Sequence, residues 1–247
     1  MVERLIPTAL VEDNKFCPGC GHGIINRILA EVLDEMKLTD KAIGSMAVGC
    51  ACLMVDTFGV DWIQSPHGRA AALATGIKRC RPENPVFTYQ GDGDSMSIGF
   101  SETMYAAFRN ENITAILVNN GIFGMTGGQM APTSLPGQKT VTSPMGRNTD
   151  LTGQPLNIIN QMKDLNIGYL ARGSVTSIKN INRVKKYIRN AFETQMSGGG
   201  YSMVEILSPC PTNWKMMPDK SLEHIDNTVT TYYPLGEYVK KGGDSNE

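Results

Sequence analysis

Short apolar segments alternate with longer helical segments along this chain, and the alternation constrains the fold more than any other feature. The apolar segments carry β-branched and aromatic side chains, which is typical of buried strands, over residues 43–48, 85–90, 114–120, 169–175 and 201–207. The segments between them have helical composition and spacing, over residues 21–38, 67–80, 98–110, 156–166 and 178–196. This order predicts an α/β fold in three layers, a parallel sheet with helices on both faces.

Length and composition exclude several kinds of protein. The 247 residues are 41% hydrophobic and 19% charged, which is enough for one large globular α/β domain. A net charge of −1 gives no electrostatic footprint for nucleic acid or an anionic membrane. No apolar run approaches the roughly 18 residues of a membrane-spanning helix, and the N-terminus does not resemble a secretory signal. We therefore expect a cytoplasmic protein, in which disulfides are rare.

The composition changes after Cys210. Residues 1–210 contain all the predicted strands, so we expect them to form one α/β domain that carries the functional site. Residues 211–247 are polar and interrupted by prolines. We expect this second segment to be a C-terminal arm that contacts a partner.

Glycine, aspartate and asparagine gather where two successive predicted strands end. The sequence Gly-Asp-Gly-Asp occupies 91–94, and Asn-Asn-Gly occupies 119–121. In parallel sheets, ligands bind outside the carboxyl ends of the strands, so both turns should face one crevice. Glycines allow a ligand to approach the backbone closely.

These turns offer oxygen ligands of the kind that Mg²⁺ prefers. Asp92 supplies a carboxylate, Asn120 an amide oxygen, and the backbone after Asn120 a carbonyl. A helix that begins near residues 97–101 would add N–H donors for an anion. The pattern predicts a diphosphate bridged by magnesium, although two ordinary turns of an α/β fold would share it.

The pair of turns resembles the signature of thiamin diphosphate enzymes. The resemblance implies that Mg²⁺ is bound by the side chains of Asp92 and Asn120 and by the carbonyl of Ile122. It also implies that the cofactor pocket is formed by Gly49, Cys50, His67, Gly68, Gly91, Asp92, Gly93, Asp94, Asn120, Ile122, Gly124, Met125 and Thr126.

Six cysteines need an explanation other than disulfides. Cys17 and Cys20 form a Cys-x-x-Cys pair, which alone fits a redox pair or half of a zinc site. Cys50 and Cys210 follow predicted strands, on the same side as the Gly-Asp-Gly turn. Four thiolates can hold Zn²⁺ or a [4Fe–4S] cluster, and a redox centre is the simpler choice beside a thiamin site. Cys80, which ends a helix, is expected to be a small buried apolar residue.

Several motifs in combination resemble the β subunit of 2-oxoacid:ferredoxin oxidoreductases. They are Cys-Pro-Gly-Cys-Gly-His, Gly-Cys, His-Gly-Arg-Ala, Gly-Asp-Gly-Asp, Asn-Asn-Gly-Ile-Phe-Gly-Met-Thr-Gly-Gly-Gln and a late Pro-Cys. Cys52 competes with Cys50 as a cluster ligand, but the family pattern is Gly-Cys, and Gly49 precedes Cys50. The resemblance therefore implies one [4Fe–4S] cluster, bound by Cys17, Cys20, Cys50 and Cys210.

The resemblance also implies an activity and partners. The reaction is the oxidative decarboxylation of a 2-oxoacid with CoA, which yields acyl-CoA, CO₂ and reduced ferredoxin. The catalytic glutamate of this family comes from an α subunit, so no catalytic residue is assigned to this chain. Electrons would leave through a γ or ferredoxin-like δ subunit. The alternatives are a non-redox thiamin enzyme subunit with structural zinc, and a cysteine-rich binding module.

The substrate is predicted from the residues expected around the pocket. A second carboxylate, as in 2-oxoglutarate, needs a fixed cation. The residues after Cys50 include Leu53 and Met54 but no Lys or Arg up to Trp62, and Met125 follows the metal turn. An apolar pocket favours 2-oxoisovalerate and other branched-chain 2-oxoacids, with 2-oxoglutarate as the alternative.

Overall fold

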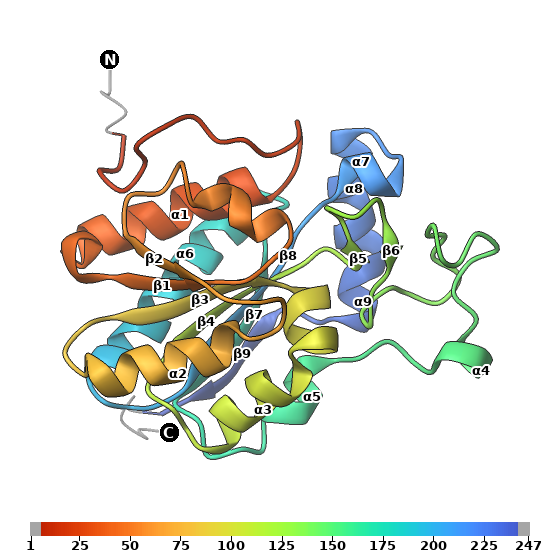
Figure 1. The fold of residues 1–247 in the computed structure, drawn as a ribbon. Coiled ribbons are helices and arrows are strands. Elements are labelled where there is room, and N and C mark those ends of the chain that lie inside the picture. Colours follow the sequence, from red (N-terminus) through yellow and green to blue (C-terminus); the bar gives the residue numbers. More distant parts are fainter. Residues whose placement is uncertain (1–5, 242–247) are drawn as a thin grey trace.

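A computed structural model describes residues 6–241, and its main feature is a seven-stranded sheet with the order β2-β1-β3-β4-β8-β7-β9 (Figure 1). Neighbouring strands pair in parallel except β7 and β9, which are antiparallel. The sheet confirms the predicted α/β fold. Its strands are β1 (Ile43–Met46), β2 (Asp61–Gln64), β3 (Val86–Gly91), β4 (Thr114–Asn119), β7 (Tyr169–Ser174), β8 (Ser202–Leu207) and β9 (Gly236–Lys240).

Helices cover both faces of the sheet. On one face lie α1 (His22–Glu35) and α6 (Ile178–Met196). On the other lie α2 (Ala70–Cys80), α3 (Phe100–Phe108) and α5 (Ile158–Met162). Successive strand side chains point to opposite faces, so Phe87 enters the core with α1 and α6 while Val86 enters the other core. The three predicted layers are therefore present.

Some element boundaries differ from the expectation. The helix expected over 98–110 is preceded by a turn of π-helix, η3 (Asp94–Ile98), so the chain becomes helical soon after the Gly-Asp-Gly turn. The helix expected over 156–166 is limited to α5. Strand β2 and several short elements were not expected: η1 (Thr39–Lys41), η2 (Cys50–Met54), the hairpin of β5 (Ile122–Phe123) and β6 (Gln129–Met130), and α4 (Thr149–Thr152).

The segment after Cys210 packs on the domain. It forms α7 (Pro211–Trp214), α8 (Pro218–His224), η4 (Ile225–Val229), α9 (Thr230–Tyr232) and β9. Ile225 and Tyr233 are buried in a small core with Leu135 and Leu207, and β9 extends the sheet beside β7. The expected arm over 211–247 is thus joined to the α/β domain as far as residue 241. Its contact with a partner stays a prediction, and residues 242–247 lie outside the described part.

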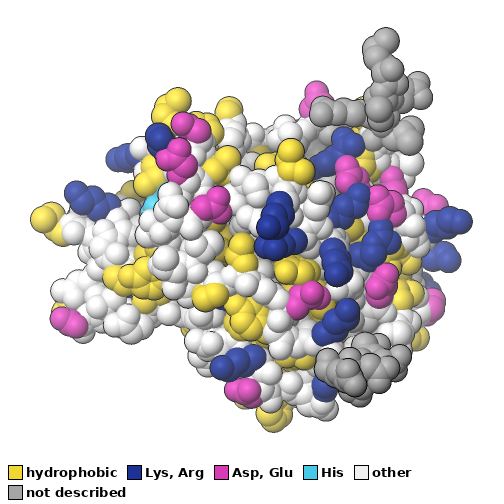
Figure 2. All heavy atoms as spheres, turned by 180° about the vertical axis from the view of Figure 1, so that it is seen from behind, with side chains coloured by type: hydrophobic (Ala, Val, Ile, Leu, Met, Phe, Trp, Pro, Cys, Tyr) yellow, Lys and Arg dark blue, Asp and Glu magenta, His cyan; other side chains and the backbone are white. Residues whose placement is uncertain are grey.

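Side chains of both charges lie on the surface of the molecule. Figure 2 shows acidic and basic side chains interspersed on the face turned away in Figure 1, with no broad patch of one sign on that face. Within residues 6–241, no helix combines the length and the hydropathy that a membrane-spanning helix requires.

A fully buried ion pair joins the neighbouring strands β7 and β8. Arg172 and Glu205 are cross-strand partners, and both side chains are 1% exposed. Nε of Arg172 lies 2.7 Å from Oε2 of Glu205. Nη2 of Arg172 also donates to Oδ1 of Asn157 at 2.7 Å, and the guanidinium lies over the ring of Tyr233. Charges this deep are tolerated because each one is paired and hydrogen-bonded.

We expect Glu205→Gln to reduce the free energy of unfolding by about 3–5 kcal/mol, because it leaves the buried Arg172 guanidinium without a counter-charge. Urea denaturation measures the change. Lys220→Ala is the control, since it removes only the exposed pair with Glu223 and should leave the denaturation midpoint unchanged. Equal behaviour of the two variants would contradict a structural role for the buried pair.

Candidate cofactor-binding site

One pocket lies outside the carboxyl ends of β1, β3 and β4, where the sequence placed the ligand. The space in and at the mouth of this pocket that atoms do not occupy is about 530 Å³, part of it open to solvent. Every predicted cofactor residue except Gly68 lines it. The complete lining is His22, Val48, Gly49, Cys50, Ala51, His67, Gly91, Asp92, Gly93, Asp94, Asn120, Ile122, Phe123, Gly124, Met125 and Thr126.

The three expected magnesium ligands belong to two touching turns. Asp92 is 1% exposed, and its carboxylate accepts hydrogen bonds from the backbone N–H of Asn120 at 3.4 Å and from the hydroxyl of Thr133. Oδ1 of Asn120 accepts from the N–H of Ile122 at 3.1 Å. Burial raises the pKa of the Asp92 carboxyl to about 7. Its hydrogen-bond partners are neutral, so a bound cation would supply the charge that this carboxylate lacks.

Asn119, the first member of the Asn pair, anchors the turn from behind. Its Nδ2 donates to Oε1 of Glu205 at 2.7 Å, and its Oδ1 accepts from the N–H of Gly121 at 3.1 Å. Gly121 has a φ of +64°, a conformation that glycine adopts without strain. The side-chain amide of Asn119 therefore links the buried ion pair to the turn that contains Asn120. Sequence reasoning gave Asn119 no role, because a polar residue at a strand end does not reveal its buried partner.

A second chain of contacts ties the other side of the turn to the same ion pair. The hydroxyl of Thr133 donates to Asp92. The backbone carbonyl oxygen of Thr133 accepts a hydrogen bond from the hydroxyl of Tyr233 at 2.9 Å. Tyr233 in turn lies beneath the Arg172 guanidinium, 5.1 Å from ring centroid to Cζ. Neither Thr133 nor Tyr233 was among the predicted site residues. Both residues lie far from Asp92 in the sequence, so no local motif indicated that they belong to the site.

Asp94 organises the loop that carries His67. One carboxylate oxygen binds Nδ1 of His67 and accepts from the N–H of Gly68 at 2.7 Å. The other oxygen accepts from Nε2 of Gln90 at 2.6 Å. Gly68 lies behind the pocket wall, with a φ of +79°, and a Cβ there would be 2.6 Å from the nitrogen of Gly99. Asp94 therefore orients His67, and Gly68 allows the loop to pack.

His22 contributes a buried, neutral imidazole to the pocket. It is 2% exposed, and its Nδ1 lies 2.7 Å from the hydroxyl of Tyr89. Its ring stacks on Phe16 at a centroid distance of 4.8 Å. Burial lowers the pKa of His22 to about 4, so the ring is uncharged near neutral pH.

The structure brings four of the six thiols into one neighbourhood. Burial raises the pKa of Cys20 to about 12 and that of Cys50 to about 11, and the neighbouring thiols add to both shifts. The neighbours that act on Cys20 are Cys210, Cys50 and Cys17. Among residues 6–241, however, no group of three or more His, Cys, Asp or Glu side chains is arranged so that it could hold a metal ion. These four thiols act on one another's pKa, but in the described residues they are not arranged as a set of metal ligands.

One expectation about the other two cysteines is wrong. Cys50 lines the pocket and Cys52 does not; Cys52 packs against the hydrophobic core, as Cys20 does, and lies close enough to raise the pKa of Cys50. Cys80 is exposed at the C-terminal end of α2 and is not the buried apolar residue expected. That end of the helix is open to solvent because Arg81, Pro82 and Glu83, which follow it, are exposed.

Two residues used to predict an apolar pocket lie elsewhere. Met54 is fully buried in the core, and Leu53 packs against it, because η2 turns the chain away from the pocket after Ala51. The apolar lining is instead Val48, Ala51, Ile122, Phe123 and Met125. The residues that line the pocket include no Lys or Arg.

Comparison with known proteins agrees with this geometry. Residues 43–206 match the family described as thiamine pyrophosphate enzyme, C-terminal TPP binding domain. The ketoisovalerate oxidoreductase subunit VorA of Methanothermobacter thermautotrophicus is 38% identical over 231 residues, which are 93% of this chain and 48% of the relative. The 2-oxoacid:ferredoxin oxidoreductase subunit beta of a Sulfolobus species is 31% identical, over 95% of this chain and 74% of the relative.

A solved structure has the same fold over nearly the whole chain. The 2-oxoglutarate:ferredoxin oxidoreductase of Magnetococcus marinus matches with a TM-score of 0.78 and 26% identity, over 98% of this chain and 87% of the solved chain. The chain spans about half the length of VorA and most of the length of the β subunit. The resemblance seen in the motifs is thereby confirmed, and the chain belongs to the thiamin diphosphate-binding β subunits of 2-oxoacid:ferredoxin oxidoreductases.

Proposed function

We propose that this chain is the cofactor-binding subunit of a CoA-acylating 2-oxoacid:ferredoxin oxidoreductase that uses branched-chain 2-oxoacids. The observation that carries the proposal is the pocket, whose wall combines the buried Asp92–Asn120 pair with the thiol of Cys50. A carboxylate that lacks a counter-charge suits a metal-bound diphosphate, and the thiol beside it suits a redox centre. Members of the family named above carry out this class of reaction by name.

In this proposal Mg²⁺ is held by the side-chain oxygens of Asp92 and Asn120 and by the carbonyl of Ile122. Thiamin diphosphate, when bound, supplies the carbanion chemistry that decarboxylates the 2-oxoacid. The protein binds and orients it. Thr133 and the N–H of Asn120 hold the Asp92 carboxylate in place, and the glycines of the two turns allow the diphosphate to approach the backbone.

The two histidines of the pocket would have different roles. His67 is held at Nδ1 by Asp94, which leaves Nε2 available to a phosphate oxygen. His22 is held at Nδ1 by Tyr89 and is uncharged near neutral pH. A neutral ring can pack beside the cofactor or the thiols at no cost in buried charge.

We further propose that Cys17, Cys20, Cys50 and Cys210 hold a [4Fe–4S] cluster. The support is the set of four thiols near the pocket, which act on one another's pKa, and the place of Cys50 in the pocket wall. Iron would have to displace the protons of these buried thiols and would supply the positive charge that their thiolates lack. Metal binding commonly completes the folding of its own site, so the thiols would converge when iron binds. Cys50 is favoured over Cys52, because Cys50 lines the pocket.

The proposal requires partners. The activating glutamate for the cofactor would come from an α subunit, and a γ or ferredoxin-like δ subunit would carry electrons to ferredoxin. CoA would be the acyl acceptor. The cytoplasm is the compartment in which thiols of this kind stay reduced.

We expect Asp92→Asn to abolish retention of thiamin diphosphate, because the change removes the charged ligand of the proposed Mg²⁺ while preserving the size of the side chain. The thiamin content of purified protein measures this. The iron content should stay at the wild-type level. Asp150→Asn, on the exposed helix α4, is the matched control and should retain the cofactor. Full thiamin diphosphate content in Asp92→Asn would rule out the proposed metal ligand.

The two neighbouring cysteines are expected to differ. Cys50→Ser should lose most of its iron and its visible absorbance, whereas Cys52→Ser should retain both, because four thiolates suffice for the cluster. Iron and sulfide analysis after anaerobic purification measures the outcome. The opposite pattern would transfer the ligand role to Cys52.

The substrate preference is expected to follow the apolar lining. With its partner subunits, the protein should have a higher kcat/KM for 2-oxoisovalerate than for 2-oxoglutarate, since each buried methylene contributes about 0.8 kcal/mol. A second carboxylate would meet no Lys or Arg from this chain's pocket lining. A preference for 2-oxoglutarate of about tenfold, or 1.4 kcal/mol, would contradict the assignment.

A further inference from the structure

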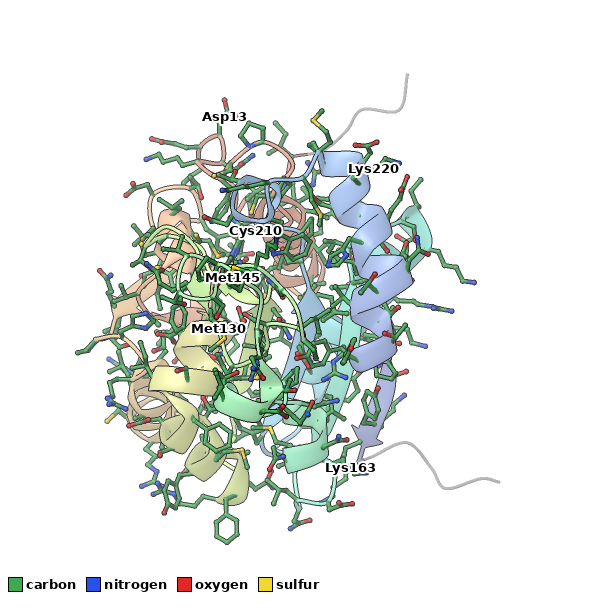
Figure 3. All side chains as sticks on the ribbon, turned by 90° about the vertical axis from the view of Figure 1, so that its right-hand side faces the viewer. Asp13, Met130, Met145, Lys163, Cys210 and Lys220 are labelled. Carbon is green, nitrogen blue, oxygen red and sulfur yellow. The ribbon has the colours of Figure 1, made fainter. Side chains whose placement is uncertain are left out.

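The short helix α7 connects the two parts of the site. It begins directly after Cys210, and the side chains of its last two residues donate to the carbonyl oxygens of Gly124 and Asn120. Figure 3 shows Cys210 where the chain enters the C-terminal helices. Nε1 of Trp214 donates to the carbonyl oxygen of Asn120 at 3.0 Å. The segment that carries one thiol thus also holds the backbone of a proposed magnesium ligand.

Asn213 makes the more direct connection. Its Nδ2 lies 3.1 Å from the carbonyl oxygen of Gly124 and 3.5 Å from Sγ of Cys210. An amide nitrogen carries two hydrogens, so one can be donated to the carbonyl and the other to the sulfur. One planar group therefore fixes the distance between the pocket wall and the thiol.

The surroundings of Asn213 leave little freedom for another arrangement. A Cβ at Gly124 would lie 3.2 Å from Sγ of Cys50 and 3.6 Å from Nδ2 of Asn213. A Cβ at Gly128, whose φ is +96°, would lie 3.0 Å from Oδ1 of Asn213. Glycines on both sides let the amide sit between the pocket turn and two of the thiols.

We propose that Asn213 is a positioning residue that couples the thiamin diphosphate site to the iron–sulfur site. The inference rests on the proposed function, because it takes Cys210 as a cluster ligand and Gly124 as part of the cofactor pocket. A hydrogen bond to a ligand sulfur stabilises the reduced, more negative cluster and so raises its reduction potential. The second hydrogen bond holds Gly124 in the pocket wall, where the cofactor would bind. Loss of the amide therefore alters both sites.

The test compares Asn213→Leu, whose side chain has a similar shape and no donor, with Thr212→Val at the exposed neighbouring position of the same helix. The backbone N–H of residue 213, which also bonds to Cys210, is retained in both variants. Both variants of the full chain are purified anaerobically. A redox titration followed by EPR measures the midpoint potential of the cluster. Calorimetry with saturating Mg²⁺ measures the affinity for thiamin diphosphate.

In Asn213→Leu the midpoint potential should shift to a more negative value, and the dissociation constant for thiamin diphosphate should rise about fivefold, as expected for one lost hydrogen bond. Thr212→Val should match the wild type in both measurements. A change in only one property, or in neither, would overturn the coupling. If Asn213→Leu fails to assemble, Asn213→Asp, which also lacks the N–H donors, is judged by the same two measurements.

The iron and thiamin diphosphate content of the wild-type protein distinguishes a failure of the proposed function from a failure of the role given to Asn213. A wild-type chain that contains no iron, or does not bind thiamin diphosphate, would contradict the proposed function itself. A wild-type chain that contains both, with unchanged properties in the Asn213 variants, would contradict only the role of Asn213.

Discussion

The buried ion pair between Arg172 and Glu205 is the interaction on which the site depends. Removing two charges from water is costly, and an apolar pair of similar volume could fill the same space at comparable stability. The pair does something that an apolar pair could not. Glu205 holds the amide of Asn119, which fixes the turn that presents Asn120. Arg172 meanwhile packs over Tyr233, which binds the carbonyl of Thr133 beside Asp92. The network reaches both proposed side-chain ligands of the metal.

The parallel sheet brings the residues of the site together at one edge. The strands β1, β3 and β4 end at the same edge, so three segments that are distant in sequence line one pocket. Strand β8 ends beside β4 and leads to Cys210, which brings a thiol to the same region. The glycines of the turns leave the backbone uncovered there. The fold thereby places a site for a charged cofactor next to a group of thiols within one domain.

Part of this arrangement could be predicted from the sequence. The alternation of strands and helices determines the fold, and Asp92, Asn120 and Cys50 follow strands at positions that must share an edge. The supporting residues could not be predicted in the same way. Asn119, Thr133 and Tyr233 act through contacts with residues far away in sequence, and nothing local marks them. Met54 was misplaced for a related reason, because η2 redirects the chain by a few residues of irregular backbone. The strand β9 was missed because residues 236–240 are mostly exposed and lack an apolar pattern.

In the proposed function, one domain holds thiamin diphosphate and an iron–sulfur cluster side by side. The most direct test is to purify the protein anaerobically and measure iron, acid-labile sulfide, zinc and thiamin diphosphate per chain. We expect about four iron atoms, about four sulfides and one thiamin diphosphate in the same molecule. Zinc in place of iron, or iron in a protein that does not bind thiamin diphosphate in the presence of Mg²⁺, would contradict it.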